Sequence, residues 1–86
     1  MLQLSLFPSA VHLAKVDDDR NMRRFYRLSI VGDLFGGPIL YREWGRIGSP
    51  GRLAATLYDS EGEAVTVLGL TALSKRRRGY TTREER

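Results

Sequence analysis

Eighty-six residues are enough for one small domain and too few for a separate catalytic unit beside it. The chain has no cysteine, which excludes a disulfide framework and thiolate chemistry. The formal net charge is +4 and the pI is about 10.0, a balance that favours a polyanionic partner.

The first nine residues read as an N-terminal extension that ends at Pro8 and Ser9. This stretch is apolar, but it lacks a basic region and Pro8 interrupts it, so we expect no signal peptide. The longest apolar-rich run, residues 64–73, is too short and too rich in threonine to span a bilayer. Together with the absence of cysteine, these features predict a soluble, cytoplasmic protein.

The middle of the chain has the pattern of antiparallel strands joined by short turns. We expect strands over residues 10–16, 25–31, 39–47 and 52–58, because β-branched and aromatic residues recur there between clusters of Gly, Pro, Asn and Asp. The links between them are short enough for hairpins, which join antiparallel neighbours.

A helix is predicted over about residues 60–77. Ser60 and Glu63 have the spacing of a capping box, and Gly79 follows the basic run as a helix-ending residue. The alternation in residues 63–69 also fits a strand, but the end signals favour the helix. Gly69 lies inside it, and we expect this glycine to mark close packing on the sheet.

These elements predict an α+β fold, in which one C-terminal helix packs on a small twisted antiparallel sheet of about four strands. The domain then covers residues 10–81, and residues 82–86 form a frayed tail.

Positive charge is concentrated in two zones of the chain. Residues 20–52 carry seven arginines against Asp33 and Glu43, and residues 75–86 carry six basic residues against two acids. If the fold brings the two zones together, they form one patch that can recruit a polyanion. The alternative is two unrelated solvated surfaces.

Trp44, the only tryptophan, lies between arginines in the third predicted strand. Alternation places Leu40, Arg42, Trp44 and Arg46 on one face of that strand. Indole can stack on a base or sugar and guanidinium groups can hold phosphates, which favours a contact surface. Tryptophan is also highly buried on average, so core packing remains an equal alternative. Gly45 between them would let a ligand or another backbone approach closely.

The run Trp44-Gly45-Arg46, followed by Ile47-Gly48, resembles the WGR domain, a family found in poly(ADP-ribose) polymerases and in bacterial proteins. Further matching features stand in the family's order along the chain: Asn21-x-x-x-Phe25-Tyr26, then Tyr41, then Glu63-Ala64, and last Lys75-x-x-x-Gly79-Tyr80. The resemblance covers about residues 11–81 and implies an antiparallel sheet with a helix packed on it.

In the polymerases this domain reads DNA ends, and the resemblance implies the same role for three matching residues here. Trp44 would pack against the sugar and base of a terminal nucleotide, and Arg46 and Tyr80 would lie near the backbone and the 5′ phosphate, with Lys75 nearby. This chain has Arg23-Arg24 where the polymerases often have Asn-Lys, which keeps the charge. The polymerases' catalytic domain is absent, so no ADP-ribosyl transfer is expected.

A second short motif lies in the N-terminal extension. Residues 3–7 resemble the peptide by which bacterial replication and repair proteins dock on the DNA polymerase sliding clamp. Leu6 and Phe7 would enter an apolar pocket while Gln3 bonds at its rim, with Leu4 and Ser5 between them. The alternative is that this alternating segment pairs with the sheet.

No catalytic or metal-binding constellation is recognisable. His12 is the only histidine and has no cysteine to join it, so we expect no metal, no cofactor and no small-molecule substrate. The sequence therefore predicts a non-enzymatic module that binds nucleic acid, with DNA favoured and RNA left open, and a protein-interaction module as the alternative. The reader residues would be Trp44, Arg46, Tyr80 and Lys75, and the electrostatic platform would comprise Arg23, Arg24, Arg42, Arg76, Arg77 and Arg78.

Overall fold

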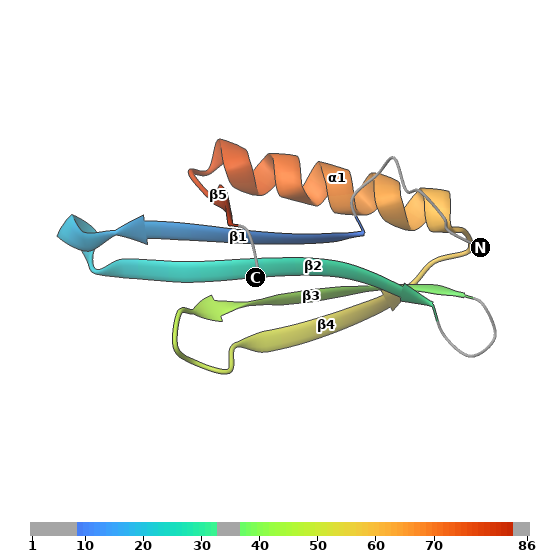
Figure 1. The fold of residues 1–86 in the computed structure, drawn as a ribbon, viewed down its shortest axis with the longest axis horizontal. Coiled ribbons are helices and arrows are strands. Elements are labelled where there is room, and N and C mark those ends of the chain that lie inside the picture. Colours follow the sequence, from blue (N-terminus) through green and yellow to red (C-terminus); the bar gives the residue numbers. More distant parts are fainter. Residues whose placement is uncertain (1–8, 33–36, 84–86) are drawn as a thin grey trace.

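The computed structural model describes residues 9–32 and 37–83. Five strands, a short 3-10 turn and one helix follow one another as β1 (Ala10–Asp17), η1 (Asp18–Arg20), β2 (Met22–Gly32), β3 (Pro38–Arg46), β4 (Arg52–Leu57), α1 (Glu61–Arg77) and β5 (Thr81–Arg83). The strands form one antiparallel sheet in the order β4-β3-β2-β1-β5, with α1 across one face (Figure 1). The α+β prediction is confirmed.

The four predicted strands are present, but the sheet has a fifth. Thr81 and Thr82 pair with Ala14 and Leu13, and Arg83 pairs with His12, so β5 extends the sheet beyond β1. The sequence predicts a frayed tail over residues 82–86, because Thr81, Thr82 and Arg83 do not form a strand pattern by themselves. The hydroxyl of Thr81 also donates to the backbone oxygen of Ala14 at 3.3 Å. Tertiary pairing with β1 thus decides the conformation of this segment.

The core lies between the helix and the sheet. Leu13, Leu28 and Leu40 from β1, β2 and β3 are fully buried, and Leu68 and Ala72 from α1 cover them. Each buried leucine or equivalent side chain contributes roughly 1.5–3 kcal/mol relative to full exposure. This layer fixes which face of each strand points toward the helix.

Local signals set both ends of α1. The hydroxyl of Ser60 accepts a hydrogen bond from the Glu63 amide at 3.1 Å, as the predicted N-cap requires. At the other end, the amides of Gly79 and Tyr80 donate to Arg76 and Lys75 oxygens, which is the Schellman pattern. Gly79 has φ +98°, a conformation that favours glycine.

Gly69 does not have the role that the sequence predicts for it. The residue is exposed, and an added Cβ would meet nothing within 4 Å. The helix turns this position toward solvent, so no close packing on the sheet requires glycine there.

None of the helices in the described part of the chain is long and apolar enough to cross a membrane. The expected clamp-binding peptide, residues 3–7, lies outside the described residues.

Candidate functional site

The β1–β2 hairpin reaches beyond the C-terminal end of α1 (Figure 1). This overhang leaves the end of the helix-facing sheet surface uncovered, and a cleft of about 530 Å³ forms there. Its walls come from the start of β2, the end of β3 and the end of α1. The lining residues are Arg20, Asn21, Met22, Arg23, Arg24, Tyr26, Trp44, Gly45, Arg46, Lys75 and Tyr80.

Aromatic rings form the floor of the cleft. Tyr26 and Trp44 are direct cross-strand partners, and their rings stack with centroids 5.9 Å apart and an interplanar angle of 18°. Tyr80 meets Tyr26 edge-on, with centroids 6.4 Å apart. Such pairs contribute about 0.5–1.5 kcal/mol beyond the area that they bury. Tyr26 is therefore the fixed centre of the cluster, and it is only 6% exposed.

Trp44 lies between the two positions that the sequence left open for it, the core and a contact surface. Its side chain packs against the edge of the core and remains partly exposed to the cleft. Leu40, two alternating positions earlier on the same face, is fully buried under the helix. Because α1 ends near Tyr26, the same face of β3 changes from core to surface along the strand, and Trp44 lies at that boundary.

The backbone of Gly51 comes so close to Gly45 that a side chain does not fit there. A Cβ at this position would lie 2.7 Å from the Cα of Gly51, which real Cβ atoms do not tolerate. The β3–β4 turn folds back over the strand at this point, with Gly48 and Gly51 at positive φ. The absence of a side chain at Gly45 thus lets the turn close beside Trp44.

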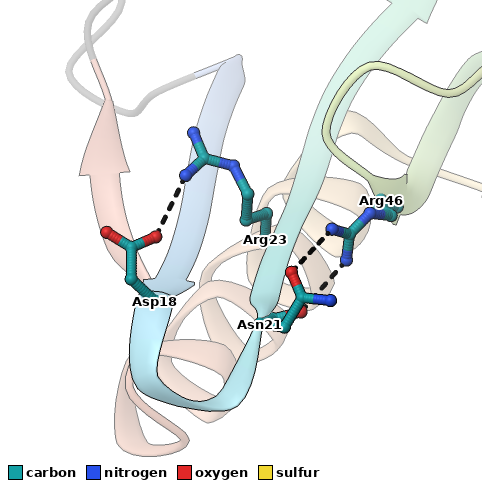
Figure 2. Close-up of polar contacts among 4 residues, drawn as sticks. All are labelled: Asp18, Asn21, Arg23 and Arg46. Carbon is teal, nitrogen blue, oxygen red and sulfur yellow. Dashed lines mark hydrogen bonds and ion pairs between the residues drawn. The ribbon is translucent and has the colours of Figure 1, made fainter.

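Arg46 is held at the rim by the turn that precedes β2. Its two terminal nitrogens donate to the backbone oxygen and the side-chain oxygen of Asn21, at 3.1 and 3.2 Å (Figure 2). Asn21 has φ +51°, a left-handed conformation that asparagine tolerates better than most residues. Arg23 points to the other side of the hairpin and pairs with Asp18 at 3.1 Å.

Lys75 extends from the last turn of α1 over the aromatic floor. Its Nζ lies 4.5 Å from the centroid of Tyr26 and 5.8 Å from that of Tyr80. Partial burial lowers the pKa of Lys75 below its ordinary value, and the nearby positive charges of Arg78 and Arg24 lower it further. The site therefore holds a cation in surroundings that disfavour its charge, and a nearby anion would offset this effect.

The charges lining the cleft are all positive. Five basic residues line it, and none of its lining residues in the described part of the chain is acidic. Within residues 9–32 and 37–83, only Arg20 and Arg23 of these five form ion pairs, with Asp17 and Asp18. An anion entering the cleft would thus meet Arg24, Arg46 and Lys75 together.

The structure separates the ten predicted contact residues into two groups. Trp44, Arg46, Tyr80, Lys75, Arg23 and Arg24 line one cleft, so residues from both basic zones of the chain meet in space. The other four predicted residues do not line it: Arg42, Arg76, Arg77 and Arg78.

Those four arginines have other positions. Arg42 lies nearer the covered end of β3, opposite Leu28, and is partly buried. Arg76 turns toward β5 and donates to the Thr82 hydroxyl at 3.0 Å. Arg77 and Arg78 are exposed at the end of the helix.

The sequence prediction misses Tyr26, Asn21, Met22 and Arg20 as lining residues. Tyr26 stands in a strand with an ordinary core pattern, and only the register of β2 with β3 places it against Trp44. The signal that was available for Asn21 is its position in the β1–β2 turn, where asparagine accommodates positive φ.

Comparison with known protein families shows the family of this chain. The sequence model of the WGR domain matches residues 9–86, nearly the whole chain. The chain belongs to the WGR domain family. All three residues that give the WGR domain its name lie in the cleft: Trp44, Gly45 and Arg46.

One relative of this WGR domain is a protein of Sinorhizobium fredii (strain NBRC 101917 / NGR234) whose name is "Uncharacterized protein y4dW". It is 38% identical over 76 residues, which are 88% of this chain and 37% of the relative. The chain thus spans little more than a third of the relative's length. No solved structure matches the chain. WGR domains are small binding modules of the nucleic-acid-binding type.

The described part of this WGR domain contains no group of three His, Cys, Asp or Glu side chains that could hold a metal ion. What the cleft offers is an aromatic floor, a fixed guanidinium and an ammonium group. Groups of this kind can bind anionic, ring-containing ligands.

Proposed function

We propose that this WGR domain is a non-enzymatic module that binds DNA ends, nicks or gaps bearing a 5′ phosphate. The observation that carries the proposal is the composition of the cleft, whose described lining combines an aromatic floor with five basic residues and contains no acidic one. Phosphate needs the cations, and a base or sugar needs the aromatic surface.

The size of the cleft favours the end of a chain over the side of a duplex. Its volume of about 530 Å³ lies in the range of sites that hold one small ligand. A single nucleotide fits that range, whereas a continuous duplex would have to pass across the rim. A terminal nucleotide could therefore enter with its sugar and base against Trp44.

The 5′ phosphate would then lie between Arg46, Lys75 and Tyr80. These residues come from β3, the end of α1 and the turn after it, so they approach from two sides of the cleft. This contact would favour the charged form of Lys75, because an anion offsets the desolvation and repulsion that lower its pKa.

Outside the cleft, exposed arginines would attract the rest of the polyanion. Arg77 and Arg78 are such residues, exposed at the end of the helix. These contacts would be independent of sequence and would weaken with salt, because binding releases counterions from the nucleic acid.

The test uses Trp44, the only tryptophan, as the reporter. We would titrate the protein with short hairpin duplexes that differ only in a 5′ phosphate, at two salt concentrations, and follow Trp44 fluorescence. The expected result is quenching at lower concentrations of the phosphorylated hairpin, with weaker binding in high salt. Matched RNA hairpins would show whether the 2′-hydroxyl is tolerated.

A closed duplex and an acidic protein of similar charge serve as controls. Equal binding of all duplexes, with no dependence on the phosphate, would reject end recognition while leaving general nucleic-acid binding. Unchanged fluorescence with every nucleic acid, together with binding of the acidic protein, would favour a protein-interaction module instead.

A further inference from the structure

The free edge of β4 has a self-complementary surface. Among the strands that the structure describes, β4 is the outermost on its side of the sheet, and the run from Leu53 to Leu57 contains no charge and no proline. Proteins usually protect a sheet edge with lysine, proline or a bulge, because its unpaired amides and carbonyls attract another strand. Leu53 and Leu57 are 62% and 64% exposed, although both are large and apolar.

The register with β3 shows which backbone groups face this edge. The amide of Tyr58 donates to the oxygen of Pro38 at 3.0 Å, so the backbone groups of Tyr58 point toward β3. In an antiparallel pair such positions alternate, so Thr56, Ala54 and Arg52 also direct their backbone groups toward β3. The backbone groups of Leu53, Ala55 and Leu57 therefore point away from the sheet.

The side chains of these same three residues share the face of the sheet opposite α1. They pair with Glu43, Tyr41 and Ile39, which alternate with the helix-facing Leu40. Leu53, Ala55 and Leu57 thus present outward backbone groups along the edge. The two leucines are exposed, and the small Ala55 lies between them.

We infer that two copies of this chain pair through β4, antiparallel and about a two-fold axis at Ala55. Side chains that face each other across an antiparallel pair lie on the same face, so Ala55 opposes Ala55 of the second copy. Leu53 then opposes Leu57 of the second copy, and the reverse pair forms across the axis. The two five-stranded sheets become one continuous sheet.

Charge is complementary in this register. Arg52 of one copy lies opposite Tyr58 of the other, next to the acidic Asp59, and the axis repeats the arrangement at the far end. The other alignments of β4 with itself that keep the faces matched pair at most two of the four leucines, whereas the axis at Ala55 pairs all four. The clefts lie on the opposite face of the sheet from these leucines.

Single cysteines test the register, since the chain has none of its own. In a hydrogen-bonded antiparallel pair the Cα atoms are about 5.5 Å apart, a distance that a disulfide spans. Ala55→Cys is expected to oxidise to a covalent dimer. Leu53→Cys alone is expected to stay monomeric on a denaturing gel. In this register the cysteines at position 53 of the two copies lie about four residues apart along the strand, too far for a disulfide. A mixture of Leu53→Cys and Leu57→Cys is expected to cross-link.

The unmodified protein gives an independent measure. Its mass in solution, followed by light scattering after size exclusion, should rise with concentration from 9.7 kDa toward twice that value. Ala55→Lys, which opposes two like charges at the axis, should lower dimer formation at least tenfold, whereas Leu70→Lys on the exposed helix surface should leave it unchanged. Circular dichroism confirms that both variants fold. A constant monomer mass at all concentrations, or equal cross-linking of the Leu53→Cys and Ala55→Cys proteins, would overturn the inference.

Discussion

Arg46 and Asn21 are joined by two hydrogen bonds between the end of β3 and the turn before β2. One guanidinium nitrogen donates to the Asn21 backbone oxygen at 3.1 Å and the other to its side-chain oxygen at 3.2 Å (Figure 2). A planar guanidinium loses little further freedom once both bonds are formed. Asn21 thus orients Arg46 at the rim of the cleft before any ligand binds.

Asn21→Gly is expected to separate this orientation from the fold. Glycine accepts the positive φ of 51° and keeps the backbone oxygen, but it removes the side-chain acceptor. We expect a stability change within about 1 kcal/mol and a several-fold weaker affinity for the phosphorylated hairpin, measured by chemical unfolding and by fluorescence anisotropy. Asn21→Ala is the comparison, and it should be the less stable of the two because alanine is strained at positive φ. Full affinity in the glycine variant would remove the orienting role of Asn21.

The charge of Lys75 is expected to lower the stability of the fold and to strengthen DNA binding. Its pKa is lowered in the folded protein, so the unfolded chain binds more protons between the folded and unfolded pKa values. The cost of its charge is fully present below the folded pKa and disappears as pH rises above the unfolded value. We therefore expect Lys75→Met to raise the thermal midpoint at neutral pH and low salt while weakening DNA binding.

Methionine suits this exchange because it keeps the length of the side chain and contacts aromatic rings through sulfur. Differential scanning calorimetry measures the midpoint, and anisotropy measures the affinity. Lys75→Arg is the control that keeps the charge, and it should retain most of the binding. If Lys75→Met lowered the midpoint, the ammonium contact with Tyr26 at 4.5 Å would outweigh the repulsion.

The two glycines at positions 51 and 69 should respond in opposite directions to alanine. At Gly51, with φ +75°, a Cβ would lie 2.5 Å from the Trp44 backbone oxygen and 2.8 Å from the Phe25 ring. We expect Gly51→Ala to destabilise the fold by at least about 1–3 kcal/mol and to shift the Trp44 emission. Gly69→Ala meets open space within α1 and should stabilise by up to about 1 kcal/mol.

Urea unfolding, followed by circular dichroism, measures both free energies. Since both substitutions add a single methyl group, the comparison isolates the environment of each glycine. If Gly51→Ala left the free energy of unfolding unchanged, the β3–β4 turn would have to relax away from Trp44 without cost.

Arg24 and Arg77 provide a matched test of the cleft, because both are exposed arginines and only Arg24 lines it. Arg24→Ala should weaken binding of the phosphorylated hairpin and reduce the slope of log affinity against log salt by about one. Arg77→Ala should cause a smaller loss of affinity that does not depend on the 5′ phosphate. Equal effects on both hairpins from both variants would indicate that the cleft is not the contact site.

Local signals in the sequence were sufficient for most of the fold. The capping residues Ser60 and Glu63, the helix-ending Gly79 and the alternating strands act over a few residues, so their physics is visible in the chain itself. β5 was missed because Thr81 to Arg83 become a strand only through pairing with β1, a partner more than sixty residues earlier.

Some features of the candidate site are also visible in the sequence, and others depend on the fold. The sequence by itself determined that Trp44 and Arg46 share one face of a strand and that basic residues flank them, because alternation and charge are local properties. Only the tertiary structure decided that α1 ends short of the β1–β2 hairpin, which leaves Trp44 partly exposed while Leu40 on the same face is buried. It also placed Tyr26 beneath Lys75 and joined Asn21 to Arg46. These relationships depend on strand register and on the position of the helix over the sheet, and the packing of the whole core sets both.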